Sequence, residues 1–224
     1  MSDAYPAINP PLAELIAVAL RDVGYVILDQ AFPIELLAQL AVRANALKPE
    51  QFKAAGIGRD AASQHNAAIR KDQIRWIADT DLIDAQYLNW MDQLRLELNS
   101  RLFLGLFDFE SHYAHYAPGT YYKKHLDAFR GNNNRIVSTI LYLNKNWQAS
   151  AGGELRLYTQ SGDKILLDVI PEYGRFVIFL SDVFPHEVKV TQQDRYSIAG
   201  WYRINNSSSS RVDPTWSKRL ASQL

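Results

Sequence analysis

The first hundred residues show mainly the spacing of three and four between apolar positions that is typical of amphipathic helices. A first predicted helix follows Pro11 and ends at Gly24. Its expected apolar face consists of Leu12, Leu15, Ile16, Val18 and Ala19. A short buried strand is predicted at Tyr25–Leu28.

Two further helices are predicted before residue 105. The earlier one begins after Pro33, and its inward positions are Leu36, Leu37, Leu40 and Val42. The later one runs from Ile83 to Leu102, with an apolar stripe of Tyr87, Trp90, Met91, Leu94 and Leu98. Between the two helices, residues 54–66 are small and polar and include glycines, which indicates a mobile loop or hairpin.

After residue 106 the pattern changes to short strand-like runs separated by turn residues. The predicted strands are Phe107–Tyr116, Tyr121–Leu126, Ile136–Leu143, Glu154–Thr159, Ile165–Ile170, Arg175–Phe179, His186–Val190 and Ile198–Tyr202. Eight strands at this spacing favour a double-sheet jelly roll or a barrel, with the helices packed outside one sheet. The predicted class is therefore α+β.

The chain is expected to form a single domain over residues 1–204. Residues 1–105 would supply helical support and a loop, and residues 106–204 would form the β core. A tail at 205–224 begins with the low-complexity run Asn205–Ser210, and we expect it to be a solvated end that does little.

Composition narrows the possible partners and sites. Lys plus Arg and Asp plus Glu both number 24, so the neutral chain offers no general field for a phosphate backbone, and we expect no nucleic acid partner. The absence of cysteine excludes disulfides, thiol nucleophiles and cysteine metal sites. Because no apolar run approaches the length of a membrane span or a secretory signal, we expect a cytoplasmic protein without a membrane partner.

Any metal must therefore be held by His, Asp or Glu, and one short motif offers two such residues together. His125 and Asp127 are two positions apart on or beside a predicted strand, so their side chains lie on one face. His186, 59 residues after Asp127, offers a third ligand. Two histidines and one carboxylate form the facial triad of non-haem Fe(II) oxygenases.

A basic residue strengthens this hypothesis. Arg195 follows His186 by nine residues, which places it at the start of the next predicted strand and within reach of the metal. Arginine can hold a carboxylate through two parallel hydrogen bonds. The alternative is a surface arginine paired with Asp194.

Seven stretches, read together, resemble one family. They are Ile69–Ile77, Tyr116–Gly119, Tyr122–Asp127, Leu141–Trp147, Gly152–Arg156, Phe184–Val188 and Arg195–Tyr202. The chain resembles the 2-oxoglutarate- and Fe(II)-dependent prolyl 4-hydroxylases over about residues 55–203. The similarity is to the branch with the oxygen-sensing hydroxylases of hypoxia-inducible factor and their bacterial relatives. It implies a double-stranded β-helix, the cupin-like jelly roll.

The resemblance also assigns residues by position. It implies that His125, Asp127 and His186 bind the iron. It implies cosubstrate binding by Arg195, Tyr142, Tyr116 and Trp201. Tyr122 and Leu155 match pocket positions, and residues 56–70 match a mobile substrate loop whose charges include Arg59 and Arg70.

The implied activity is hydroxylation of a prolyl C4 in a protein, with release of succinate and CO2. The cofactors would be Fe(II), 2-oxoglutarate and O2, with ascorbate as a reductant, and an oxygen-sensing role would follow. Two alternatives remain: a hydroxylase of a free amino acid or small molecule, and a non-catalytic jelly-roll binding module. The protein substrate and the oligomeric state are not predicted.

Overall fold

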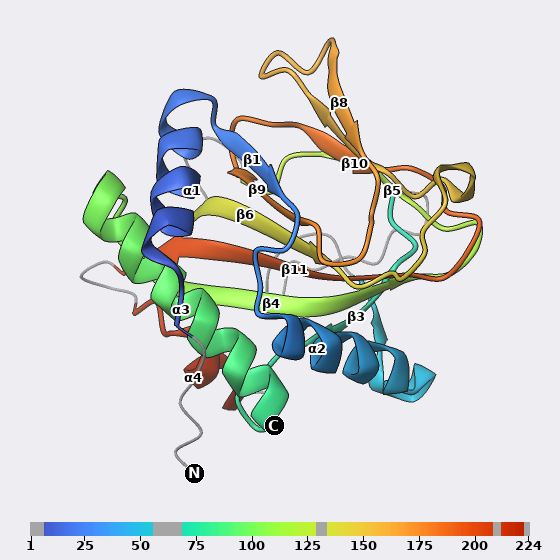
Figure 1. Ribbon diagram of the computed structural model, residues 1–224, viewed down its shortest axis with the longest axis horizontal. Coiled ribbons are helices and arrows are strands. Elements are labelled where there is room, and N and C mark those ends of the chain that lie inside the picture. The colour runs from blue at the N-terminus through green and yellow to red at the C-terminus, as the bar shows by residue number, and fades with distance from the viewer. Residues whose placement is uncertain (1–6, 56–68, 129–133, 208–211, 222–224) are drawn as a thin grey trace.

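The computed structural model describes residues 7–55, 69–128, 134–207 and 212–221. Its centre is a pair of antiparallel sheets (Figure 1). The larger sheet has seven strands in the order β1 (Tyr25–Leu28), β9 (Phe176–Leu180), β6 (Arg135–Tyr142), β11 (Arg195–Ile204), β4 (Leu106–Tyr116), β3 (Gln73–Trp76) and β2 (Lys53–Ala54). The smaller sheet has four, in the order β5 (Tyr122–His125), β10 (His186–Val188), β7 (Leu155–Tyr158) and β8 (Ile165–Val169).

The eight predicted strands are β4 to β11, and they form the expected jelly roll. The predicted strand at Tyr25–Leu28 is β1, which pairs with β9 at the edge of the larger sheet. The strands β2 and β3 were not predicted, since β2 has only two residues and β3 only four, of which two are polar. They pair antiparallel on either side of residues 56–68, which lie outside the described residues.

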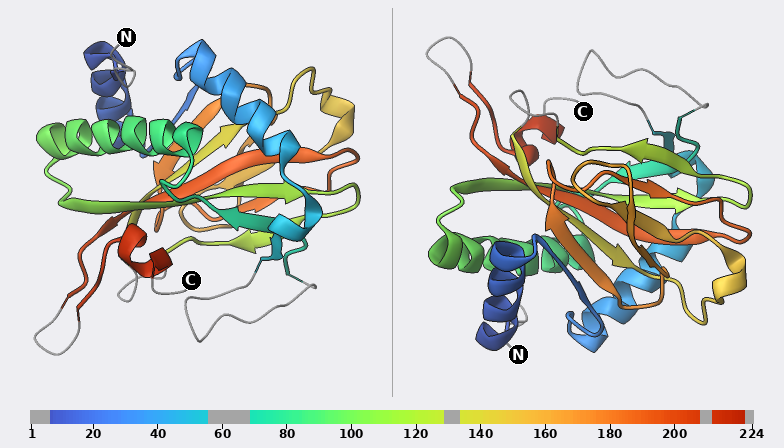
Figure 2. Two further views of the ribbon diagram at one scale, coloured as in Figure 1. Left: turned by 90° about the horizontal axis from the view of Figure 1, so that it is seen from below. Right: turned by 90° about the horizontal axis from the view of Figure 1, so that it is seen from above.

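Three long helices cover the outer face of the larger sheet (Figure 2). These are α1 (Pro10–Asp22), α2 (Ile34–Ala46) and α3 (Leu82–Leu102). The helix α3 begins where the Asp81 side chain accepts hydrogen bonds from two backbone N–H groups, and it buries the predicted stripe. One apolar core lies between the helices and this sheet, and a second lies between the two sheets.

Two predicted inward positions are wrong. Leu15 is 49% exposed and Val42 is 68% exposed. The helix α1 instead buries Ala13, Ile16, Ala17 and Leu20, and α2 buries Ala41 and Ala44 beside its leucines. Both helices thus turn their alanines toward the core, where small side chains let the packed backbones approach closely.

The C-terminal segment is also unlike the expectation of a solvated end. Asp213 and Trp216 are buried, and Trp216 is the first residue of the short helix α4 (Trp216–Ala221). Hydrogen bonds join this segment to β4 and to the residue after β3. Within the described ranges, no helix has the length and apolar character needed to cross a membrane.

Candidate active site

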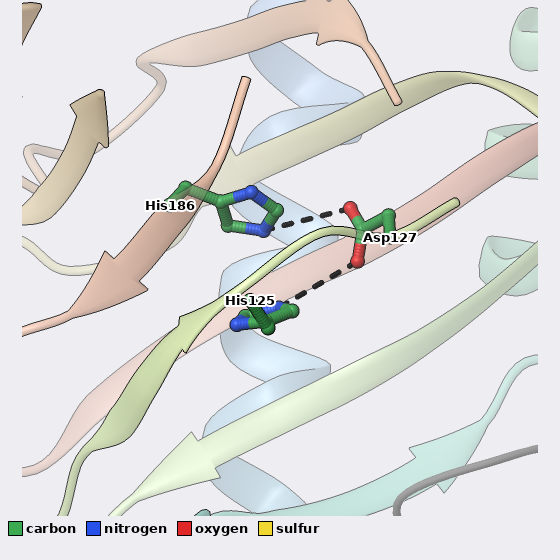
Figure 3. A group of neighbouring side chains, drawn as sticks. All are labelled: His125, Asp127 and His186. Carbon is green, nitrogen blue, oxygen red and sulfur yellow. Dashed lines mark ion pairs between the residues drawn. The ribbon is translucent and has the colours of Figure 1, made fainter. Parts of the chain in front are cut away.

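Three side chains with metal-binding atoms meet between the sheets (Figure 3). His125 ends β5 and His186 begins β10, and the two residues are paired across these strands. Asp127 lies two residues beyond His125, and its carboxylate oxygens are 3.6 Å from His125 Nε2 and 3.5 Å from His186 Nε2. One atom from each of the three residues lies within 4.8 Å of the others. The predicted cluster is therefore assembled.

Both histidines have a fixed ring orientation. His125 Nδ1 lies 2.8 Å from the Lys123 carbonyl oxygen, and His186 Nδ1 lies 3.0 Å from that of Phe184. Because a carbonyl only accepts, each Nδ1 carries the proton and each Nε2 keeps its lone pair. Burial, assisted by His125, lowers the pKa of His186 to about 4, which keeps this imidazole neutral at pH 7.

The carboxylate of Asp127 is held from the larger sheet. Ser138 of β6 donates a hydrogen bond of 2.7 Å to Asp127 Oδ2, and its hydroxyl also contacts Ser181 at 2.9 Å. Burial acts to raise the pKa of Asp127, but His186 and His125 outweigh it and lower the pKa well below its usual range. Two imidazoles and an ionised carboxylate are the donor set that suits non-haem Fe(II).

A buried cation faces the cluster from the larger sheet. Arg195 begins β11, as predicted, and is 1% exposed. Its Nε donates to the Gly153 carbonyl at 2.9 Å, and its guanidinium lies about 5 Å from the ring centres of Tyr116 and Tyr142. The alternative pairing with Asp194 is not seen, because that carboxylate contacts His115 instead.

The backbone at Gly153 determines how closely Arg195 is held. This glycine has a φ of +71°, and a Cβ there would lie 3.2 Å from Arg195 Cδ and 3.1 Å from Trp147 Cζ2. A larger residue would therefore displace the arginine stem as well as strain the turn. The carbonyl contact was not predicted, although both glycines stand in the sequence as Gly152–Gly153.

Tyr142 supplies an unused polar group beside Arg195. Its hydroxyl is buried and has no hydrogen-bond partner among the described residues. Burial raises the pKa of Tyr142, with Arg195 acting in the opposite direction, so the phenol stays protonated. A buried cation beside an unpaired donor fits a carboxylate ligand such as the distal end of 2-oxoglutarate.

The remaining predicted pocket residues surround this space. Tyr116 of β4 is buried, which raises its pKa strongly. Trp201 of β11 is paired with Ser138, next to Asp127. Tyr122 stacks on His125 with ring centres 3.6 Å apart, and Leu155 of β7 is in the core between the sheets.

The structure describes one of the two charged residues that are predicted to contact the substrate. Arg70 lies over the Tyr122 ring at 4.3 Å and donates to the buried Asp72 at 2.7 Å. Arg59 lies outside the described residues. Asp72 was not predicted as a site residue, although it stands within the matched stretch Ile69–Ile77.

Comparisons with known proteins agree with this geometry. Residues 111–203 match the model of the 2OG-Fe(II) oxygenase superfamily. Prolyl hydroxylase EGLN3 of Homo sapiens is 32% identical over 205 residues, which cover 84% of this chain and 82% of the human protein.

Solved structures show the same likeness. A prolyl-4-hydroxylase of Pseudomonas putida is 40% identical, with a TM-score of 0.77 over 86% of this chain and 98% of the other. A Trichoplax adhaerens prolyl hydroxylase, in complex with a peptide fragment of the hypoxia-inducible factor oxygen degradation domain, is 26% identical. Its TM-score is 0.75, over 87% of this chain and 90% of the other. The chain thus belongs to the prolyl hydroxylase family of the 2OG-Fe(II) oxygenases.

Proposed function

We propose that this protein hydroxylates C4 of a prolyl residue in a protein, with conversion of 2-oxoglutarate to succinate and CO2. As a 2OG-Fe(II) oxygenase, it uses Fe(II), 2-oxoglutarate and O2. The observation that carries the proposal is the His125, Asp127 and His186 cluster facing a buried arginine and an unpaired phenol. A binding module without redox chemistry would not require this combination.

In this proposal the three clustered residues hold the iron, and Arg195 with Tyr142 holds the distal carboxylate of 2-oxoglutarate. Bound Fe(II) and 2-oxoglutarate supply the oxidising chemistry. Burial keeps His186 neutral, and the pKa of Asp127 lies well below its usual range, with the Arg135 charge among the groups that lower it. Ser138 fixes the direction of the carboxylate.

The surrounding aromatic residues exclude water and orient the cosubstrate. Tyr116 and Tyr142 flank the Arg195 guanidinium, which prevents it from turning toward solvent. Arginine keeps its charge at any physiological pH, so the hold on a carboxylate does not weaken with ordinary pH changes. The protein therefore acts mainly by orientation and by shielding a reactive centre.

A protein substrate is supported by the relatives of high coverage. The Trichoplax enzyme was solved with a peptide, and the Pseudomonas enzyme is described as a prolyl-4-hydroxylase. An oxygen-sensing role and a cytoplasmic location stay predictions. The substrate charges Arg59 and Arg70 and the pocket positions Tyr122 and Leu155 belong to the same proposal.

The test is incubation of the purified enzyme with bacterial lysate, Fe(II) and 2-oxoglutarate, followed by mass spectrometry of tryptic peptides. We expect a gain of one oxygen on a prolyl residue, together with succinate formation. The His186→Ala variant is the control and should give neither. Succinate formation with free amino acids but with no modified peptide would favour the small-molecule alternative and contradict a protein substrate.

A further inference from the structure

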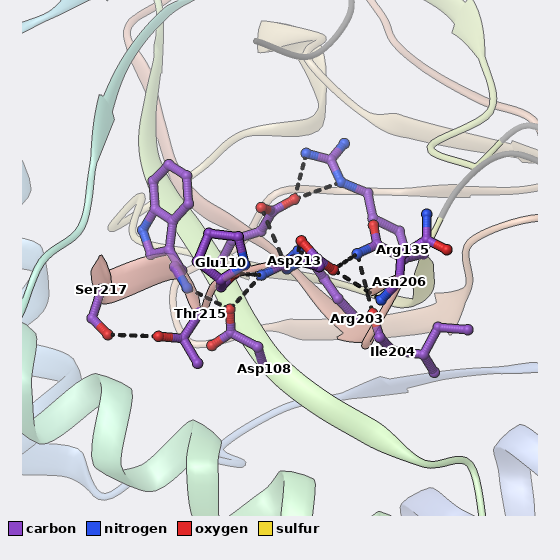
Figure 4. Close-up of polar contacts among 12 residues, drawn as sticks. Asp108, Glu110, Arg135, Arg203, Ile204, Asn206, Asp213, Thr215 and Ser217 are labelled. Carbon is purple, nitrogen blue, oxygen red and sulfur yellow. Dashed lines mark hydrogen bonds and ion pairs between the residues drawn. The ribbon is translucent and has the colours of Figure 1, made fainter. Parts of the chain in front are cut away.

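Figure 4 shows a network of buried charges around Arg203 of β11. Arg203 is eight residues from Arg195 on the same strand, so both side chains lie on one face of the larger sheet. The Arg203 side chain is 0% exposed. Its nitrogens lie 2.6 Å from Asp108 Oδ2, 3.3 Å from Asp213 Oδ1 and 3.6 Å from Glu110 Oε2. Because water does not reach this guanidinium, these carboxylates must compensate its positive charge.

The network attaches the C-terminal segment to the sheet. Asp213 Oδ2 accepts hydrogen bonds from Asn134 Nδ2 at 2.9 Å and from the Asn206 N–H at 3.0 Å. The Trp216 N–H donates to Asp108 at 2.6 Å, and its indole N–H donates to the Ile77 carbonyl at 3.2 Å. The C-terminal segment is thus bound to the larger sheet through Asp213 and through Trp216, the first residue of α4.

The other side of the network reaches Trp201. Glu110, which is buried, accepts from Arg135 Nε and Nη2 at 2.8 Å each. The Arg135 guanidinium then lies 3.7 Å from the centre of the Trp201 ring. Trp201 is paired with Glu110 on one side and with Ser138 on the other, and Ser138 donates to Asp127.

We infer that the C-terminal segment positions Trp201, and with it the wall of the pocket beside the His125, Asp127 and His186 cluster, through Asp213, Arg203, Glu110 and Arg135. Glu110 contacts both arginines, so its position depends on how the charge of Arg203 is neutralised. Loss of the Asp213 charge draws Glu110 toward Arg203 and away from Arg135. Arg135 is then no longer held over the indole.

The first test does not depend on the reaction. The full chain is labelled with 5-fluorotryptophan, and the Trp201 resonance is assigned among the five tryptophans by its loss in Trp201→Phe. Asp213→Asn should shift the Trp201 resonance while the Trp90 and Trp147 resonances stay in place. Asp213→Glu, which keeps the charge, should restore the wild-type position.

A matched control separates this effect from general destabilisation. Asp84 is equally buried and pairs with Arg43 on the helical side of the molecule. Asp84→Asn should lower the melting temperature without moving the Trp201 resonance. If Asp84→Asn moves that resonance as much as Asp213→Asn does, or if Asp213→Asn does not move it, the inference is wrong.

The second test rests on the proposed function and uses a synthetic copy of the hydroxylated peptide found in lysate. Asp213→Asn should raise the peptide KM about fivefold, the loss expected from one cation–π contact. The KM for 2-oxoglutarate should rise as well, because Trp201 is one of the predicted cosubstrate residues. Arg135→Met should reproduce both the KM change and the shift, because it removes the guanidinium that lies over the Trp201 ring.

The two tests fail in different ways. If the wild-type protein hydroxylates no peptide, the proposed function fails, and the fluorine spectra still decide whether Asp213 positions Trp201. If the peptide is a substrate but neither Asp213→Asn nor Arg135→Met alters its KM, the segment does not shape this wall of the pocket.

Discussion

Tyr142→Phe should stabilise the protein and weaken its cosubstrate binding at the same time. The Tyr142 hydroxyl is buried without a hydrogen-bond partner among the described residues. An unpaired buried hydroxyl costs about 1–3 kcal/mol, so its removal should raise the free energy of unfolding by about 1 kcal/mol. In a chain of this size that corresponds to about 2–4 °C in melting temperature.

The same hydroxyl is placed to donate to the carboxylate of 2-oxoglutarate. A hydrogen bond to a charged group contributes about 1.5–3 kcal/mol, which makes 2-oxoglutarate bind about tenfold to hundredfold more weakly to Tyr142→Phe. Thermal unfolding without metal and cosubstrate measures the first effect. Calorimetric titration of 2-oxoglutarate with Fe(II) under nitrogen measures the second.

A second buried tyrosine is the control. The Tyr202 hydroxyl donates to the Met91 carbonyl at 2.7 Å, so Tyr202→Phe should lower the melting temperature and leave 2-oxoglutarate affinity unchanged. The two variants remove the same atom with opposite expected signs. If Tyr142→Phe is destabilised like Tyr202→Phe, or binds 2-oxoglutarate as tightly as the wild type, the assignment of this hydroxyl is wrong.

Three further predictions concern the site and its surroundings. Arg195→Lys should raise the KM for 2-oxoglutarate about tenfold or more and leave Fe(II) affinity little changed, because an ammonium group cannot make the two parallel hydrogen bonds of a guanidinium to a carboxylate. Steady-state kinetics and metal titration measure the two quantities. An unaltered KM would show that the carboxylate binds elsewhere. His186→Ala should lose Fe(II) binding by calorimetry while circular dichroism stays that of the wild type, and retained tight binding would refute the cluster. Burial, assisted by Arg70, lowers the pKa of His112 to about 4. Between pH 6.5 and pH 4, His112 binds a proton in the unfolded chain but not in the folded chain, so its titration lowers the free energy of unfolding by about 3 kcal/mol as the pH falls. In His112→Gln, the free energy of unfolding measured with urea should therefore depend less on pH over this range.

The predictions that succeeded depended on local patterns. The eight core strands are short runs of strand-forming residues between turn residues, and the stripe of α3 repeats every three or four residues. The His125 and Asp127 pair follows from the period of a strand. Each of these signals lies within a few residues of chain.

The predictions that failed concern contacts between distant segments. Trp216 donates to the carbonyl of Ile77, 139 residues away, and no local pattern shows that the tail has such a partner. Val42 is more apolar than Ala44, yet it is exposed because helix packing favours the smaller side chain. Ser138 could not be assigned to Asp127 from sequence, since a single hydroxyl in an apolar strand has many possible partners.

The location of the site between two sheets has a mechanical consequence. His125 and His186 belong to the smaller sheet, whereas Arg195 and Tyr142 belong to the larger one. Metal and cosubstrate together would therefore link the two sheets, adding to the apolar packing and to polar contacts such as the one between Ser138 and Asp127. At a hundred times its dissociation constant, a ligand that binds only the folded state adds about 2.7 kcal/mol of stability. Loss of iron or 2-oxoglutarate would then weaken the packing of the two sheets as well as stop turnover.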